Sequence, residues 1–312
     1  MSTKLGKLYK RRHLLQHMFI ELRKIGKKNK YYLIHTFRVQ EKVKRISRYL
    51  GSDLNNNKLG ELRKRAEEII LQQIKESKRL DFELADTEIL KYKNFEKDIK
   101  IEHLNINWAD FIKQFTYNTN AIEGSTVNYN EVAELLNKNE APKNQDELET
   151  IEVANTIIFL KKLKEKELSL DLIKQVHYSC FNKTKSFAGK LRTVEVIIRD
   201  GLGHIIHQGA PSKNVSKLLI GLVDWYNKHR KKYPPLLLAG LLHNQFEEIH
   251  PFQDGNGRVG RLLLNFVLLT NNYPPISIKL KNRKRYYRVL RIFDKTGNIN
   301  PTIKFLLSQY KK

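Results

Sequence analysis

Apolar residues recur at helical spacing along most of the chain after residue 58. One such set lies at positions i, i+3, i+4 and i+7, which form a single face of an α-helix: Trp108, Phe111, Ile112 and Phe115. This helix is expected to end near Glu123, because Gly124 can adopt the left-handed conformation of a helix C-cap. The same spacing predicts further helices over residues 129–138, 145–166, 169–182, 213–230, 235–249, 257–271 and 283–294.

Two segments depart from this helical pattern. Residues 31–50 are rich in β-branched and aromatic residues that alternate with polar ones, so we predict a β-hairpin there. The polar run 52–57 follows it and marks a boundary between domains. A second, shorter hairpin is predicted from residues 193–198 and 204–207, which flank a turn containing glycine. The chain is therefore expected to be mainly α, with two small hairpins.

The segment between the helices predicted over 235–249 and 257–271 carries the clearest chemistry. Residues 250–261 read His-Pro-Phe-Gln-Asp-Gly-Asn-Gly-Arg-Val-Gly-Arg. Pro251 disfavours α conformation at His250, so the first helix should end there. Small residues at the start of the next helix let backbone N–H groups converge on an anion, at the positive end of the helix dipole.

Four side chains of this segment suit a bound polyphosphate. Arg258 and Arg261 are three positions apart and can face the same anion. Asp254 supplies an oxygen ligand of the kind that Mg²⁺ prefers. His250 titrates near neutrality and can take a proton from an incoming hydroxyl. A glycine-rich helix start or a helix-end histidine alone is commonly structural, but their conjunction within these twelve residues favours a nucleotide site.

Residues 250–261 resemble the signature of the Fic family, His-Pro-Phe-x-Asp-Gly-Asn-Gly-Arg-x-x-Arg, without departure at a defined position. The resemblance implies a Fic fold and transfer of AMP from ATP to a Ser, Thr or Tyr hydroxyl of a target protein. It makes His250 the general base and Asp254 the Mg²⁺ ligand, and Gly257 favours AMP transfer over the kinase branch of the family. The implied ATP-binding residues are Asp254, Gly255, Asn256, Gly257, Arg258, Val259, Gly260, Arg261, Tyr286 and Tyr287.

The resemblance extends over roughly residues 105–310. Residues 189–193 and the hairpin after them resemble the family's flap, which positions the target by strand addition; the implied flap residues are Val196, Ile197, Ile198 and Arg199. Tyr286 and Tyr287 resemble a stretch that lines the adenine site. Asp294 departs from the family there, because some relatives have asparagine at this place.

A second motif lies before the signature. Thr119-Asn-Ala-Ile-Glu123-Gly124 resembles the family's inhibitory motif, and its glutamate could pair through both oxygens with Arg261. The pair would keep Arg261 from the γ-phosphate. In some relatives the same glutamate also serves removal of AMP, so transfer, removal or both remain open. The implied domains are a basic module at 1–57, a helical segment at 58–140 with this motif, and a Fic core at 141–312.

Charge and composition add a separate hypothesis. The net charge is +25, and residues 1–60 hold 16 Lys and Arg residues against three acidic ones. Residues 1–57 could therefore bind nucleic acid, although a solvated lysine-rich surface is the more common explanation of such a charge. Cys180 is the only cysteine, and no apolar run reaches the length of a membrane span. We expect a cytoplasmic protein without membrane contact, and leave self-modification and a homodimer open.

Overall fold

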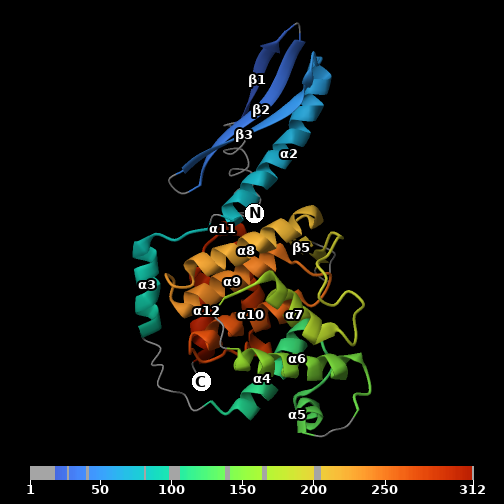
Figure 1. Ribbon diagram of the computed structural model, residues 1–312, viewed down its shortest axis with the longest axis vertical. Coiled ribbons are helices and arrows are strands. Elements are labelled where there is room, and N and C mark those ends of the chain that lie inside the picture. The colour runs from blue at the N-terminus through green and yellow to red at the C-terminus, as the bar shows by residue number, and fades with distance from the viewer. Residues whose placement is uncertain are drawn as a thin grey trace. The chain divides into compact units, whose positions relative to one another are not determined.

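The computed structural model describes residues 18–26, 28–39, 42–80, 82–97, 106–137, 141–163, 167–199 and 205–310. The chain divides into two compact units, residues 1–83 and 84–312 (Figure 1). Most of the described residues are helical, as predicted. Among the described helices, none combines the length and the apolar character needed to cross a bilayer.

The first unit contains an antiparallel sheet with strand order β1-β2-β3, followed by one helix. The elements are β1 (Met18–Ile25), β2 (Lys28–Val39), β3 (Lys42–Ser52) and α2 (Asn56–Leu80). Strands β2 and β3 form the predicted hairpin. Strand β1 was not predicted, because its apolar residues lie on both faces of the sheet: Met18 is buried while Phe19 and Leu22 are exposed.

Helix α2 packs against one face of this sheet. Ala66, Ile70 and Ile74 of the helix form one buried cluster with Met18 and Leu33 of the strands. The division of the chain therefore falls after residue 83 rather than at residue 57, where the sequence suggested it, because α2 packs its apolar residues against the described strands.

The second unit is helical apart from one small hairpin. Its helices are α3 (Asp86–Lys97), α4 (Trp108–Glu123), α5 (Tyr129–Asn137), α6 (Gln145–Lys162), α7 (Leu170–Phe181), α8 (Val215–His229), α9 (Pro235–Ile249), α10 (Asn256–Thr270), α11 (Arg283–Thr296) and α12 (Asn300–Tyr310). The remaining elements are β4 (Ile197–Arg199), β5 (Ile205–Gln208) and the 3₁₀ turns η1 (Ser212–Asn214) and η2 (Leu280–Asn282). Helix α12 was not predicted; its proline, Pro301, lies in the first turn, where proline is tolerated.

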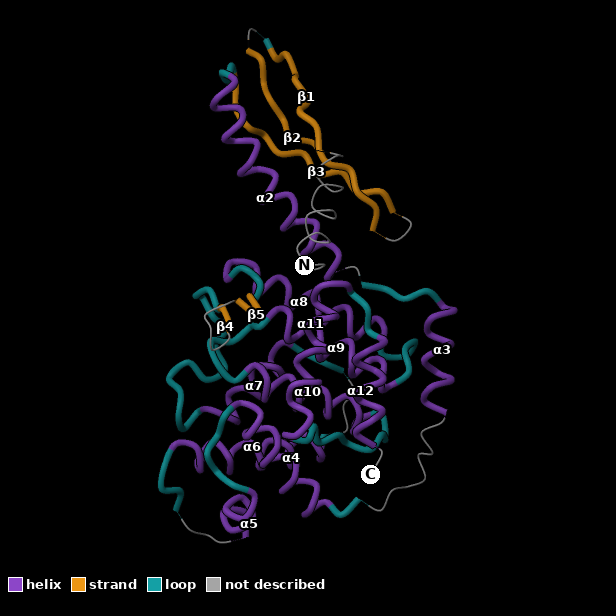
Figure 2. Tube along the Cα trace, turned by 180° about the vertical axis from the view of Figure 1, so that it is seen from behind, coloured by secondary structure: helices purple, strands orange, loops and turns teal. Residues whose placement is uncertain are grey.

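Helices α9 and α10 run through the middle of this unit (Figures 1 and 2). They pack against each other, with α8, α11 and α12 beside α9 and α4, α6 and α7 beside α10. Almost every residue of both helices is buried, including polar ones such as His243, Arg258 and Arg261. The loop that joins them, residues 250–255, is consequently held between two of the most deeply packed helices.

Local signals define the helix that precedes this core. Asn107 caps the N-terminus of α4, since its side chain accepts a hydrogen bond from the Asp110 amide. At the other end Gly124 is left-handed, with φ of 99°, and closes the helix after Glu123. The predicted end of this helix is confirmed, and it fixes where the Glu123 carboxylate can reach.

Candidate active site

The loop between α9 and α10 is shaped by its first and last residues. Helix α9 ends at Ile249, and His250 takes a left-handed conformation with φ of 54°, which is uncommon for a residue with a side chain. Gly255, with φ of 78°, precedes the first residue of α10. A side chain at Gly255 would also collide with Phe181, whose ring lies 2.4 Å from the position of an added Cβ. The loop thus joins His250, at the end of α9, to the first residue of α10 through residues 251–255.

Asn256 closes this loop on itself. Its side-chain amide donates to the Phe252 carbonyl at 2.8 Å, and its oxygen accepts from the Phe252 N–H at 2.8 Å. Both side chains are buried. Asn256 was expected to contact the phosphates, whereas its side chain here holds the loop together through Phe252.

His177 supports the same loop from α7 and was not predicted. Its ring stacks on Phe252 with centroids 3.8 Å apart. Nδ1 accepts from the Gly189 N–H at 2.8 Å, so Nε2 carries the proton and donates to the Asp254 carbonyl at 3.1 Å. Burial lowers the pKa of His177 to about 4, against smaller opposing effects of Asp254. The ring is therefore neutral at physiological pH and defines the position of Asp254.

Arg261 is held by the end of α4. Its Nε donates to the Thr119 hydroxyl at 2.7 Å, and Nη2 donates to the Thr119 carbonyl and to Glu123 Oε1, each at 2.8 Å. The pairing with Glu123 that the motif suggested is present through one carboxylate oxygen, Oε1. Burial alone would lower the pKa of Arg261, yet Glu123 and the nearby tyrosines raise it overall.

Glu123 also lies against the N-terminus of α10. A Cβ added to Gly257 would fall 2.2 Å from Glu123 Oε1, so only glycine permits this approach. The carboxylate thus occupies the place where the helix start would receive an anion. The Glu123 carboxylate therefore contacts both Arg261 and the N-terminus of α10.

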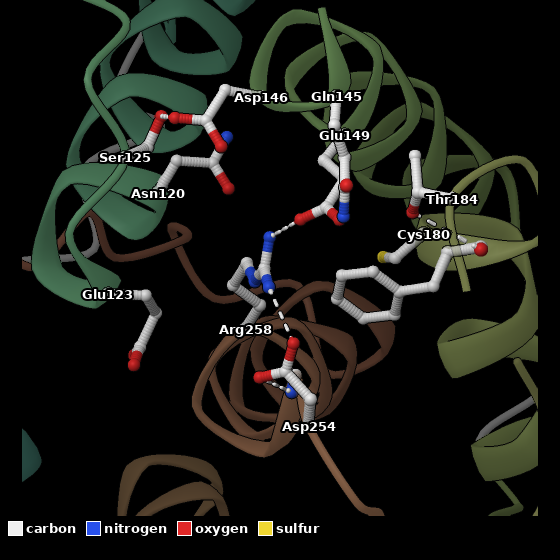
Figure 3. A network of polar contacts seen from close by, with 12 residues as sticks. Asn120, Glu123, Ser125, Gln145, Asp146, Glu149, Cys180, Thr184, Asp254 and Arg258 are labelled. Carbon is white, nitrogen blue, oxygen red and sulfur yellow. Dashed lines mark hydrogen bonds and ion pairs between the residues drawn. The ribbon is translucent and has the colours of Figure 1, made fainter. Parts of the chain in front are cut away.

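Arg258 points to a different group of residues (Figure 3). It is buried, pairs with Glu149 of α6, and lies over the Phe181 ring at 4.4 Å. We expected Arg258 and Arg261 to face one polyphosphate; here Arg258 pairs with Glu149 and Arg261 with Glu123. Glu149 was not predicted, because 109 residues separate it from Arg258.

Asp254 lies at the open end of this group, with its side chain half exposed. Its Oδ2 pairs with Lys185 at 2.9 Å and lies 3.9 Å from Arg258 Nη2, while Oδ1 accepts from the Gly255 N–H at 2.7 Å. Burial raises the pKa of Asp254, but Lys185 and Arg258 together lower it below its ordinary value. Lys185 also lies 3.4 Å from Glu149, so it links the two carboxylates.

The remaining predicted ATP contacts lie deeper in the core. Val259 is fully buried, and Gly260 lies against Glu247 and His243 of α9. The Tyr286 hydroxyl, on α11, lies 2.9 Å from His243 Nε2 and 3.4 Å from Arg261 Nη1. Tyr287 is partly buried, with its ring centroid 5.2 Å from that of Tyr286.

The predicted flap is the hairpin of β4 and β5. Ile197 pairs with Gln208, Ile198 with His207 and Arg199 with Ile205. Val196 is partly buried and Ile197 is exposed. The side chains of Ile198 and Arg199, and the turn at 200–204, lie outside the described residues.

The two central helices and the loop between them lie almost entirely within a segment that matches a known protein family. Residues 167–268 match the model of the Fic/DOC family. These residues are therefore similar to the Fic domains of known proteins.

The Fic relatives include proteins and solved structures. The protein adenylyltransferase Fic of Nematostella vectensis is 29% identical over 201 residues, covering 62% of this chain and 45% of the relative. Protein adenylyltransferase fic-1 of Caenorhabditis elegans is 27% identical, covering 62% of this chain and 38% of the relative. The chain thus spans less than half the length of these relatives.

Two solved structures share the fold. A Fic domain containing signaling protein from Bacteroides thetaiotaomicron has a TM-score of 0.57 and 27% identity, covering 71% of this chain and 89% of that protein. Fic-1 from Caenorhabditis elegans has a TM-score of 0.59 and 24% identity, covering 82% and 75%. The helical unit accordingly has the Fic fold that the signature implied.

Proposed function

We propose that this chain transfers AMP from ATP to a hydroxyl of another protein and that Glu123 restrains the reaction. The observation that carries the proposal is the position of Glu123, whose carboxylate contacts Arg261 at 2.8 Å and lies against Gly257 at the start of α10. A carboxylate at a helix N-terminus beside a buried arginine marks a site built for anions. Because relatives of this chain are named protein adenylyltransferases, we infer that the bound anion is the triphosphate of ATP.

The proposed reaction proceeds by direct displacement. His250 takes the proton from the target hydroxyl, the hydroxyl oxygen attacks the α-phosphorus, and the bond to the leaving pyrophosphate breaks. The amides at the start of α10 hold the phosphates, and Arg261 holds the γ-phosphate once Glu123 withdraws. The β4–β5 hairpin holds the target by strand pairing.

Asp254 is the residue we assign to Mg²⁺. Its carboxylate is half exposed, has a lowered pKa and already binds a cation, the Lys185 ammonium. A single carboxylate with water and phosphate oxygens is the donor set that Mg²⁺ uses in nucleotide sites. When bound, the metal would neutralise charge on the phosphates, and Lys185 would have to leave Asp254 Oδ2.

The proposal is tested by labelling with ATP that carries a labelled α-phosphate. Glu123→Gly should label proteins of a lysate, or itself, faster than wild type. Misplacement of the reacting atoms by ~1 Å can lower the reaction rate about 100-fold, so Glu123→Gly is expected to raise the labelling rate by a comparable factor. Glu123→Gln is the matched variant of similar size without charge, and Glu123→Gly with His250→Ala is the inactive control. Equal initial rates in wild type and Glu123→Gly would count against inhibition by Glu123. Absence of labelling by both Glu123→Gly and Glu123→Gln would count against AMP transfer.

Removal of AMP is a second candidate for the same site. The Glu123 side chain is 31% exposed and reaches the site edge, so water can approach it. If Glu123 serves removal, Glu123→Gly raises the plateau of labelled protein without changing the first turnover. Incubation of labelled protein with wild type in the absence of ATP tests removal directly.

Nucleic-acid binding is a further candidate for the first unit. The sheet face opposite α2 exposes Phe19 and Tyr49, and Arg23 lies over the Tyr32 ring at 4.3 Å. Exposed aromatic rings beside basic groups are typical of surfaces that stack bases. Binding to single-stranded nucleic acid should fall steeply with salt and weaken in Tyr49→Ala; unchanged binding in that variant would reject this face.

A further inference from the structure

Arg192 is a buried arginine whose hydrogen bonds go to main-chain carbonyl oxygens. Its side chain lies before β4 and is only 4% exposed as a residue. Nε donates to the His250 carbonyl at 2.6 Å and Nη1 to the Val194 carbonyl at 2.7 Å. Nη2 donates to the Ala210 carbonyl and, at 3.3 Å, to that of Ile249. We call these four acceptors the carbonyl cage.

The carbonyl cage joins three segments that are far apart in the sequence. Val194 precedes β4, Ala210 follows β5, and the other two carbonyls belong to the end of α9 and to His250. Backbone bonds reinforce the junction: the Arg192 N–H donates to the Pro251 carbonyl at 2.9 Å, and the Ala210 N–H to the Ile249 carbonyl at 3.1 Å. The base of the hairpin and the turn at His250 are therefore one hydrogen-bonded unit.

The guanidinium group suits this position better than any other side chain. It presents five N–H donors in one plane, so it can reach carbonyls on opposite edges at once, whereas an ammonium is a single point. Burial lowers the pKa of Arg192, with Glu195 opposing the change. The cost of burying this cation is offset by carbonyl dipoles that all point toward it.

Gly209 provides a second, independent observation. A Cβ added there would lie 2.7 Å from Arg192 Nη2, 3.1 Å from the His250 Cβ and 3.4 Å from the Ile249 carbonyl oxygen. The end of β5 therefore passes so close to the turn that only glycine fits without displacement. His250 itself has a left-handed backbone, which L-residues adopt only when their surroundings hold it.

We propose that Arg192 is a positioning residue that couples the target-binding hairpin to His250. This inference rests on the proposed AMP transfer. A target strand bound along β4 and β5 would be held in register with the imidazole, because the same guanidinium fixes the base of the hairpin and the His250 backbone. ATP binding, which depends on the start of α10, does not pass through the carbonyl cage.

The test compares Arg192→Met and Arg192→Lys in the Glu123→Gly background, with Arg230→Met as the matched control. Arg230 lies at the C-terminal end of α8 and pairs with Glu167 near the surface. Arg192→Met should lower kcat for a labelled target by about 100-fold, as expected for a misplacement of ~1 Å, and raise the target KM. Its Kd for a non-hydrolysable ATP analogue should stay within about twofold, while Arg192→Lys should recover part of kcat.

Two further measurements keep the inference testable whatever the variants do. Gly209→Ala leaves the guanidinium in place but pushes against it, and should give the same split between kcat and ATP affinity. Hydrogen exchange of the Gly209 and Ala210 amides should quicken in Arg192→Met without faster exchange in α10. A kcat within about threefold of the parent, or ATP affinity falling in parallel with kcat, overturns the coupling. Absence of labelling by the Glu123→Gly parent instead counts against the proposed transfer, and hydrogen exchange then still decides the coupling.

Discussion

Arg258 and Arg261 lie one turn apart on α10, and each is paired with a glutamate from another helix. Arg258 meets Glu149, whose side chain is 6% exposed, within a group that also contains Lys185 and Asp254. Arg261 meets Glu123, whose side chain is 31% exposed and lies at the end of its helix. The same two residue types thus form a closed pair, Arg258–Glu149, and an open pair, Arg261–Glu123.

The difference concerns what each pair can do. Separating a fully buried pair leaves an uncompensated charge in the core, which is costly. The Glu123 side chain is instead partly exposed, and without its contact Arg261 would still have two bonds to Thr119. We therefore interpret the Arg258 pair as part of the scaffold and the Arg261 pair as the movable element of the site.

The largest expected effect lies in the loop that both pairs flank. In the Glu123→Gly background, His250→Ala should reduce AMP transfer by about 10²–10⁴-fold, because a positioned base contributes that much. Binding of an ATP analogue should persist, since the amides of α10 are unchanged. The check is a label-transfer rate beside an equilibrium titration; an unreduced rate would remove His250 from the reaction.

The second prediction compares the two glutamates directly. Glu149→Gln should lower the free energy of unfolding by about 3–5 kcal/mol, as is usual when one member of a buried pair is removed. Glu123→Gln should lower it by about 1 kcal/mol or less, because its place is open to water. Denaturant unfolding of both variants measures this. Similar losses in the two would abolish the distinction between scaffold and movable pair.

The third prediction concerns Asp254 and its cation. Asp254→Asn should raise the Mg²⁺ concentration needed for half-maximal labelling by about tenfold or more, since a neutral amide is a weaker ligand for a hard cation. Asp171→Asn, an exposed substitution in the first turn of α7, is the control. If Asp254→Asn and the control respond alike, the metal is not held by Asp254.

Local features of the sequence predicted much of this arrangement. The period of apolar residues gave α9 its observed limits, and Gly124 marked the end of α4, because both depend on neighbouring residues alone. The site residues that were missed depend on contacts between distant segments. Glu149 lies on a helix with charged residues on all sides, so its burial cannot be predicted from its neighbours. The residues next to Arg192 and His177 in the sequence likewise do not indicate their contacts with main-chain carbonyls and with the Phe252 ring. Asn256 shows the converse, since its motif suggested phosphate but its side chain closes the loop.

The smallest effect should appear in the pH dependence of the closed pair. Burial raises the pKa of Glu149, but Arg258, Gln145 and Lys185 lower it overall below its ordinary value. The native protein thus binds fewer protons here than the unfolded chain, so the stability from Glu149 is present above the unfolded pKa of about 4.5 and is lost as pH falls through the native pKa. The difference in unfolding free energy between wild type and Glu149→Gln should therefore be largest near pH 7 and become smaller toward pH 3. The pKa of His177 is also lowered, to about 4, so the free energy of unfolding falls further as the pH drops from 6.5 to 4. His177 is present in both proteins, and this effect therefore cancels from their difference. If this difference in unfolding free energy stayed constant from pH 7 to pH 3, Glu149 would stabilise the fold through packing. The charge of the closed pair would then not be what stabilises it.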